Sequence, residues 1–505
     1  MFSGRLIFKN TLLLTSAALL LRLLSMLFQA YLAGYVGAEG LGLIQLVLSV
    51  LSFALTLGLA GARVTVTCLA AEEHGCRRPA GVRSAVNCCL GWTLLASFLA
   101  AAALFLLSPW LARSVLHEPQ MAVCLRLAAG LLPVSCVNLV LSGYFTATGQ
   151  VLRLTAIDAS ERIVCFVLTF FLLRAAAGDT VSACLALLGG DLLASCAAAA
   201  MLYAQYRRAD GRAAEPAPGH MARRVRQLAS SLALSDYLRA ALRVLEQFLI
   251  PWGLMQSGAA RQSSMAAYGT ITGMVFPILM CPAALLYALI DLLIPELAAC
   301  RAQGRLTRLS SVATQCLQAG LLFCGFIAGL LFCLAAPLTA LLYRSDAAGD
   351  LLRMFSPLIL ILYMDVLVDG MLKGLSQQIS IVRYNTLTSA LDVVFLFVLL
   401  PRWGLRGYIF TFAATHILNF ALSLRRLLLV SGCRLPLDAL ARVLLCTAGA
   451  AAIASLASVP DAWPLLALRA VMFSASYTLL SCLTGAARRC LPQSLCSLLP
   501  SARSR

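Results

Sequence analysis

Long apolar segments recur along nearly the whole chain, and they constrain its fold more than any other feature. Crossing the hydrocarbon core of a bilayer takes roughly 20 residues of α-helix, and uninterrupted runs of about 18 apolar residues are typical of such helices. Strands of a membrane β-barrel would instead alternate over segments of about 10 residues. The charged fraction is only 12%, about half that of a soluble domain. The sequence therefore predicts an all-α polytopic membrane protein.

The apolar segments predict about fourteen transmembrane helices, each near the length that a bilayer needs. The first runs from Thr11 to Ala33, which is too long for the apolar part of a signal peptide, and we expect it to remain as a span. The predicted spans are 11–33, 41–70, 84–108, 121–143, 152–174, 181–204, 228–254, 267–297, 310–340, 351–372, 384–400, 405–427, 438–458 and 464–486.

Basic residues gather on every second connection between these spans. Cytoplasmic loops of membrane proteins are enriched in Lys and Arg, so this asymmetry predicts cytoplasmic N- and C-termini and an even number of spans. The predicted cytoplasmic segments hold, among others, Arg77, Arg78, Arg83, Arg207, Arg208, Arg223, Arg301, Arg305, Arg425 and Arg426. The predicted outer segments hold few, namely Arg113, Arg261, Arg344, Arg402 and Arg406.

A polar, basic stretch divides the spans into two sets of six. It predicts an N-terminal lobe over 1–206, a cytoplasmic linker over 207–227, a C-terminal lobe over 228–430, two added helices over 431–486 and a cytoplasmic tail over 487–505. Six-helix repeats in one orientation are a transporter architecture, with the substrate path in a central cavity where the repeats meet.

Motifs of soluble enzymes and of metal sites do not occur in the sequence. The 19 cysteines form no CxxC pair, and the four histidines are far apart. We interpret cysteines within apolar runs, such as Cys68, Cys88, Cys89, Cys165 and Cys324, as buried structural thiols. There is no HExxH, P-loop or GxSxG motif, and no basic groove suited to nucleic acid. We expect no catalytic residues, no metal and no cofactor.

Charged residues inside apolar spans are the candidate functional residues, because a charge at mid-bilayer is costly and usually faces a cavity or a partner. Arg22 has about ten apolar residues on either side. Arginine in a cavity suits an anionic substrate, since its fork of donors matches phosphate. A structural alternative is local pairing, as between Asp236 and Arg239. The candidate substrate contacts are Arg22, Arg239, Arg243, Glu246 and Glu161, and the candidates for a coupling cation are Asp158, Asp365 and Asp369.

Several segments resemble the stage V sporulation protein B family. They are the stretch with Arg22 that leads to Gly34-Tyr-Val-Gly37-Ala-Glu-Gly40-Leu-Gly42, Ser142-Gly143-Tyr144-Phe145, Leu245-Glu246 with Pro251, Tyr268-Gly269 with Gly273 and Pro277, Leu293 to Glu296, Leu375 with Gln377, Arg383 and Asn385, and Gly404-Leu-Arg-Gly407-Tyr408. The chain departs from the family pattern at Ser25, where glycine is usual, and at Arg153 and Asp158, where proline and glutamine are usual.

The resemblance implies an alternating-access flippase of the multidrug/oligosaccharidyl-lipid/polysaccharide exporter superfamily. Its substrate would be a polyprenyl-pyrophosphate-linked glycan, namely a peptidoglycan precursor for the spore cortex, and its location the bacterial plasma membrane. In the lipid II flippase branch, cavity arginines are essential; Arg22 matches one of them, but Phe28 stands where a second is usual. Expected partners are the lipid-linked oligosaccharide, membrane lipids and cell-wall synthesis enzymes.

Three other functions stay open at this stage. One is a cation-coupled multidrug antiporter on the same scaffold, which would export hydrophobic cations. Another is a membrane scaffold that recruits cell-wall enzymes without transporting anything. The third, a membrane glycosyltransferase, needs an acidic site in an outer loop, where only Asp346 and Asp350 are available.

Overall fold

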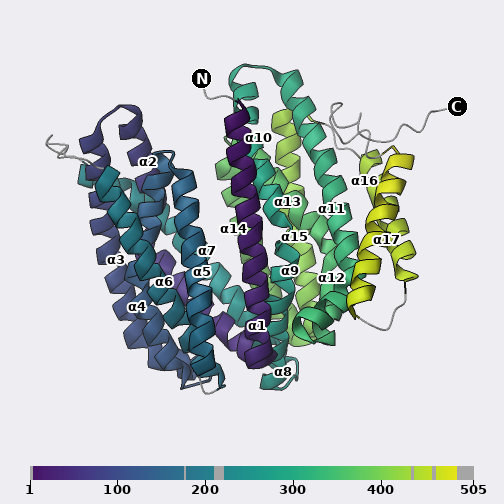
Figure 1. Cartoon of the computed structure of the whole chain (residues 1–505), viewed down its shortest axis with the longest axis horizontal. Helices are drawn as coiled ribbons and strands as arrows, with labels where there is room; N and C mark the ends of the chain where they lie inside the picture. The colour runs from purple at the N-terminus through teal and green to yellow at the C-terminus, as the bar shows by residue number, and fades with distance from the viewer. Residues whose placement is uncertain (1–3, 176–177, 210–220, 434–436, 458–461, 486–505) are drawn as a thin grey trace. The chain divides into compact units, whose positions relative to one another are not determined.

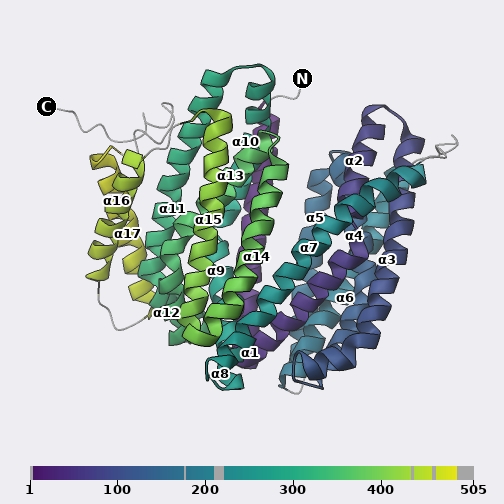
Figure 2. The ribbon, with the colours of Figure 1, turned by 180° about the vertical axis from the view of Figure 1, so that it is seen from behind.

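The computed structural model describes residues 4–175, 178–209, 221–433, 437–457 and 462–485, with the side chains of 4–15, 292 and 462 excepted. Within these ranges all regular structure is helical and there is no strand. The polar core of the predicted linker at 210–220 and the predicted tail at 487–505 lie outside the described residues. Figure 1 and Figure 2 show the ribbon from two opposite sides.

Twelve helices of the described chain are long and apolar enough to cross a membrane. One of them, within α1 (Gly4–Leu59), runs for 44 residues from Ser16. At 1.5 Å per residue that is about 66 Å, or twice the thickness of the hydrocarbon core. Two further predicted spans correspond to α5 (Val151–Ala175) and α7 (Met221–Gln256), whose charges keep them outside the twelve. The prediction of an all-α polytopic membrane protein is confirmed.

Helix breaks at glycine or proline separate the first two predicted spans and change two others in detail. Inside α1, Gly37 takes φ 71° and ψ 179°, which interrupts the helix between the first two predicted spans. The second predicted span, 41–70, ends as a helix at Leu59, and a turn with Gly61 at φ 74° leads into α2 (Ala62–Gly75). The predicted span 267–297 is interrupted before α10 (Ala283–Ala302), because Pro282 has no N–H to continue the helix.

The chain forms two compact units. Their bounds differ from those of the predicted lobes, and the division into lobes stays a prediction. Unit 1 comprises 1–17, 35–252 and 261–269, and unit 2 comprises 18–34, 253–260 and 270–505. Most of α7 therefore lies with unit 1. The helix α1 contributes to both units, with 18–34 in unit 2 and 35–59 in unit 1.

Unit 1 is a bundle in which α4 packs against α2, α3 and α6, and α6 packs in turn against α5. The remaining bounds are α3 Pro79–Ser114, α4 Met121–Ala147, α6 Thr180–Ala209 and α8 Arg261–Gly269. Glycines permit the closest approaches of backbones. A Cβ atom on Gly42 of α1 would lie 2.5 Å from the carbonyl oxygen of Met265 in α8.

Unit 2 is built around α13, which packs against α10, α11 and α15, while α14 packs against α15. The hairpin of α16 and α17 packs on α11 (Figure 1). Gly325 and Gly329 of α11 permit this contact, since a Cβ on Gly329 would lie 2.5 Å from the ring of Phe473. The other bounds are η1 Thr270–Val275 (a π-helix), α9 Phe276–Met280, α11 Leu306–Tyr343, α12 Asp346–Phe355, η2 Ser356–Leu358, α13 Ile359–Gly374, α14 Gln378–Trp403, α15 Leu405–Ser431, α16 Leu437–Ser455 and α17 Ala462–Leu483.

The cysteines of the described residues are free thiols, and they do not gather into a metal site. Cys89, Cys165 and Cys324 are buried, as predicted, whereas Cys88 is only half-buried. Cys68 is exposed, so its predicted burial is wrong, because the end of the second predicted span is the separate short helix α2 and this residue lies on its outward face.

Candidate functional site

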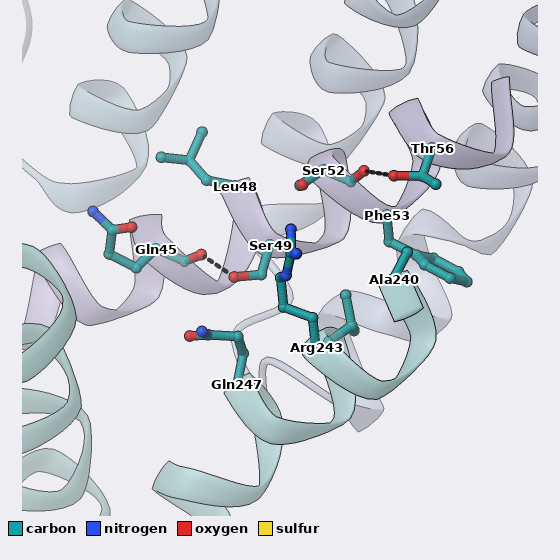
Figure 3. A pocket seen from close by; sticks show the side chains of 10 residues that line it. Gln45, Leu48, Ser49, Ser52, Phe53, Thr56, Ala240, Arg243 and Gln247 are labelled. Atoms are coloured by element: carbon teal, nitrogen blue, oxygen red, sulfur yellow. Dashed lines mark hydrogen bonds between the residues drawn. The ribbon is translucent and has the colours of Figure 1, made fainter. Parts of the chain in front are cut away.

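A polar pocket of about 180 Å³ lies within unit 1, between the second half of α1 and α7. Figure 3 shows Arg243 of α7 pointing toward the stretch of α1 that carries Ser49 and Ser52. The polar residues of the pocket are Gln45, Ser49, Ser52, Thr56, Arg243 and Gln247. None of its lining residues is acidic. We call it the Arg243 pocket.

The pocket exists because polar residues share one face of each helix. On α1, Gln45, Ser49, Ser52 and Thr56 follow one another at intervals of four, three and four residues, which places them on one side of an α-helix. On α7, Arg243 and Gln247 are one turn apart and lie on a common face for the same reason. The charge-based reading of the sequence found Arg243 but missed the uncharged stripe on α1. The heptad-like spacing in an apolar span was the available signal.

Hydrogen bonding leaves Arg243 free to bind a ligand. Its side chain is exposed and makes no hydrogen bond or ion pair with any residue of the described ranges. Across the pocket, Ser49 and Thr56 donate to the carbonyl oxygens of Gln45 and Ser52, at 2.8 and 3.0 Å. Their hydroxyl protons are thereby used, while their oxygen lone pairs can still accept.

Gln247 is oriented by a buried tyrosine. The hydroxyl of Tyr268 donates to Gln247 Oε1 at 2.5 Å, so the amide NH₂ of Gln247 can point elsewhere. The pocket therefore combines a guanidinium, an amide donor and hydroxyl acceptors. That set of groups suits a ligand with a negative charge and several hydroxyl groups.

The two other candidate residues on α7 do not line the Arg243 pocket. Arg239, one turn earlier, donates to Asp236 at 2.6 Å, so the predicted local pairing is the arrangement that forms. Glu246 lies next to the pocket in sequence but is not among its lining residues.

Arg22 lies in unit 2, where its guanidinium stabilises a helix break. Its Nη1 donates to the carbonyl oxygen of Met280 at 2.7 Å, and its Cζ lies 5.2 Å from the centre of the Tyr287 ring. The usual helical donor to the Met280 carbonyl is the N–H of Ala284, which beside the break at Pro282 donates to the carbonyl oxygen of Cys281 instead, at 3.3 Å. Arginine has five N–H donors, so most of them remain for another ligand.

Glu161 belongs to a charged group inside unit 1. Ser195 donates to Glu161 Oε1 at 2.7 Å. Asp158 lies within electrostatic range of Glu161, Arg162 and Arg63, and Asp191 within range of Arg162 and Glu161. The predicted contacts Glu161 and Asp158 are thus close to each other.

Asp365 and Asp369 of α13 anchor a polar ladder in unit 2. Asn419 of α15 donates to Asp365 Oδ2 at 2.8 Å, and Ser423, one turn further, donates to Asp369 Oδ1 at 2.9 Å. Oδ1 of Asp365 is buried and has no hydrogen-bond partner among the described residues. A buried carboxylate oxygen without a donor is a candidate acceptor for a proton or a monovalent cation.

The ladder continues along α15 toward Asp392. Thr415 donates to Asp392 Oδ1 at 2.7 Å, and Thr415 and Asn419 are again one turn apart. Within the described ranges, no three His, Cys, Asp or Glu side chains converge as metal ligands. The ladder is therefore a series of separate carboxylates, each accepting hydrogen bonds from its neighbours, and not a metal centre.

Unit 2 also holds an apolar groove of about 200 Å³ between α11, α13, α15 and α16. Its lining includes Leu317, Met364, Phe420 and Leu440, and every lining residue is apolar. A groove of this kind suits a hydrocarbon chain.

The chain is similar in sequence to known proteins. Residues 7–250 match the family described as "Polysaccharide biosynthesis protein". Stage V sporulation protein B of Bacillus subtilis is 23% identical over 359 residues, which cover 67% of each chain. The predicted resemblance is confirmed.

Two solved transporter structures have a similar fold. The lipid II flippase MurJ in an inward closed conformation aligns with a TM-score of 0.66 and 13% identity, over 94% of this chain and 98% of that one. An inward-facing multidrug resistance MATE family transporter of the MOP superfamily aligns with a TM-score of 0.64 and 16% identity, over 82% and 96%. The chain is a multi-pass bacterial membrane protein with a transporter fold.

Proposed function

Because the chain resembles polysaccharide biosynthesis proteins and has a transporter fold, we propose that it flips a polyprenyl-pyrophosphate-linked glycan across the membrane by alternating access. The similarity to stage V sporulation protein B makes a peptidoglycan precursor for the spore cortex the proposed cargo. Cell-wall synthesis enzymes would supply or consume it.

The observation that carries the proposal is the chemistry of the Arg243 pocket. A pyrophosphate needs a guanidinium that is not already paired, and Arg243 is such a group. A sugar needs donors and acceptors at short spacing, which Gln45, Ser49 and Gln247 supply. Arg22 is proposed as a further contact through the donors that Met280 does not use. Arg239 is a weaker candidate because Asp236 holds it.

The hydrophobic end of the substrate would use the apolar groove of unit 2. One wall of this groove is α16, the first of the two added helices. Burying one CH₂ away from water contributes about 0.8 kcal/mol. A polyprenyl tail in a bilayer is already away from water, so its binding to the groove would depend on close packing and not on the hydrophobic effect. The groove would therefore guide the tail more than hold it.

Coupling to an ion gradient is proposed for Asp365, with Asp369 and Asp158 as further candidates. Asp365 is favoured because one of its oxygens is buried without a donor. Glu161 and Glu246 would pair with arginines or contribute to the same proton or cation binding.

The multidrug antiporter remains the second candidate, because the fold is also that of a MATE family transporter. A cationic drug would need a carboxylate or an aromatic cage in its site. The Arg243 pocket has a guanidinium and no acidic residue, which favours an anionic cargo.

The proposal is tested by reconstituting the full chain in proteoliposomes with a fluorescent lipid-linked glycan and measuring its accessibility to an added quencher. Losing a charge-assisted hydrogen bond costs about 1.5–3 kcal/mol, so Arg243→Ala should reduce flipping about 10- to 150-fold at limiting substrate. The control is Arg226→Ala, which removes an exposed arginine from the cytoplasmic end of the same helix.

Three results would contradict the proposal. The first is wild-type protein that flips no lipid-linked glycan but moves hydrophobic cations, which favours the antiporter. The second is equal flipping by Arg243→Ala and wild type. The third is a cell in which pocket variants support sporulation while loop variants do not, which favours the scaffold.

A further inference from the structure

The turn between α14 and α15 carries a shallow depression of about 730 Å³ that none of the proposed functions uses. Its lining comes from two separate segments, Ser257 after α7 and the residues 402–406. Both segments belong to unit 2 and lie at or next to connections between predicted spans that the charge bias places on the outer side of the membrane. We call this depression the outer arginine site.

The backbone makes the site a rigid feature. Gly404 takes φ 54° and ψ −135°, a conformation that side chains other than hydrogen rarely allow, and it turns the chain directly from α14 into α15. A Cβ on Gly407 would lie 2.6 Å from the carbonyl oxygen of Leu399, so the two helices touch just behind the turn. Figure 2 shows α14 and α15 side by side.

The second wall is held equally closely. A Cβ on Gly253 would lie 2.6 Å from Cβ of Leu400, so the end of α7 packs against the end of α14. This contact fixes Ser257 beside Gly404, where a Cβ would lie 3.3 Å from the Ser257 hydroxyl oxygen. The depression is therefore preformed.

Two guanidinium groups on the site have no partner. Arg402 and Arg406 are exposed and make no hydrogen bond or ion pair with any residue that the structure describes. One outer arginine differs in this respect, because Arg261 pairs with Glu118 at 2.9 Å. Two like charges without a carboxylate in one small depression produce a positive potential that attracts anions.

A tryptophan lies between the two arginines in sequence. Trp403 is 56% exposed, and Phe410 packs edge-on against it with ring centres 6.0 Å apart, which fixes the orientation of its ring. An exposed, oriented aromatic face can stack against the apolar face of a sugar ring, and the two guanidiniums can each bind a carboxylate or phosphate through paired hydrogen bonds.

We infer that the outer arginine site binds an acidic saccharide, one that carries carboxylate or phosphate groups, on the outer side of the membrane. A phospholipid headgroup is the rival ligand, because Trp and Arg also anchor proteins at the membrane interface. The saccharide is favoured by the chemistry of the six lining residues, which lie at the adjoining ends of α14 and α15, at the turn between them and after α7. Leu405 is the single aliphatic side chain among them, so an acyl chain finds little to pack on.

The test uses the full chain in nanodiscs, which expose both faces. The probes are a uronic-acid oligosaccharide and a neutral oligosaccharide of equal length, added to nanodiscs of phosphatidylcholine, with calorimetry as the readout. Wild type should bind the acidic probe and not the neutral one. Arg402→Gln with Arg406→Gln should weaken binding at least tenfold, and Trp403→Leu should weaken it several-fold.

Matched controls separate a site from general interface chemistry. Arg344→Gln removes another exposed outer arginine, and Trp463→Leu removes a tryptophan that is 70% exposed at the start of α17. Both should bind the acidic probe like wild type. Equal binding by wild type and the double variant overturns the inference. The inference is also overturned if the acidic probe no longer binds in phosphatidylglycerol nanodiscs and the protein binds phosphatidylglycerol directly, because the site would then be a headgroup site.

The inference is independent of the proposed transport function. The outer arginine site shares no residue with the Arg243 pocket, and binding is measured without flipping. A negative result in one assay therefore leaves the other proposal standing.

Discussion

Arg22 offers the sharpest test of how the structure uses a charge inside a span. In Arg22→Ala, the carbonyl oxygen of Met280 loses its donor and the ring of Tyr287 loses a cation. A hydrogen bond from a charged group contributes about 1.5–3 kcal/mol, and a cation–π contact about 0.5–2 kcal/mol. Together they predict a loss of about 2–5 kcal/mol in the stability of unit 2.

That loss can be measured as a shift in thermal unfolding. For a domain of this size, 1 kcal/mol corresponds to about 2–4 °C in Tm, so Arg22→Ala should unfold at least about 4 °C below wild type in detergent. Arg22→Gln restores a neutral donor to Met280 and should recover part of the Tm. It should not recover flipping, because it lacks the positive charge that an anion needs.

The two readouts separate the structural role of Arg22 from its proposed contact with substrate. A Tm of Arg22→Ala within 1 °C of wild type would refute the argument from the helix break at Pro282. Wild-type flipping by Arg22→Gln would refute the anion contact while leaving the structural argument intact.

Two further predictions concern packing and coupling. Gly269→Leu should destabilise the protein by more than the roughly 1–3 kcal/mol that is typical of overpacking, since any Cβ there overlaps the backbone of Ala38. Gly130→Ala, where nothing lies within 4 Å of the added Cβ, should be neutral or stabilising by up to about 1 kcal/mol. A lower Tm for Gly130→Ala than for Gly269→Leu would contradict this account of the packing. Asp365→Asn keeps the acceptor for Asn419 and removes the charge, so flipping should lose its dependence on an imposed proton or sodium gradient while Tm stays near wild type. The control Asp350→Asn, on an exposed part of α12, should leave the gradient dependence and the Tm unchanged. An unaltered gradient response in Asp365→Asn would count against the coupling role.

The membrane class and helical fold follow from the sequence by itself. An apolar run of about 20 residues has only one way to satisfy its backbone in lipid without a barrel, so the spans could be predicted from composition and length alone. The breaks at Gly37 and Pro282 were also visible as residue types, although their consequences were not.

The tertiary structure alone decided which polar groups meet. The partner of Arg22 is a backbone carbonyl 258 residues away in sequence, and no sequence pattern near Arg22 predicts this contact. The sequence already offered Asp236 as a local partner for Arg239, and that pair forms; that Arg243 opens onto a pocket could be seen only in the tertiary structure. The stripe at Gln45, Ser49 and Ser52 was not predicted, because placing uncharged polar side chains in a membrane helix costs little free energy and does not by itself indicate a function. It becomes a candidate site only when α7 sets a guanidinium opposite it.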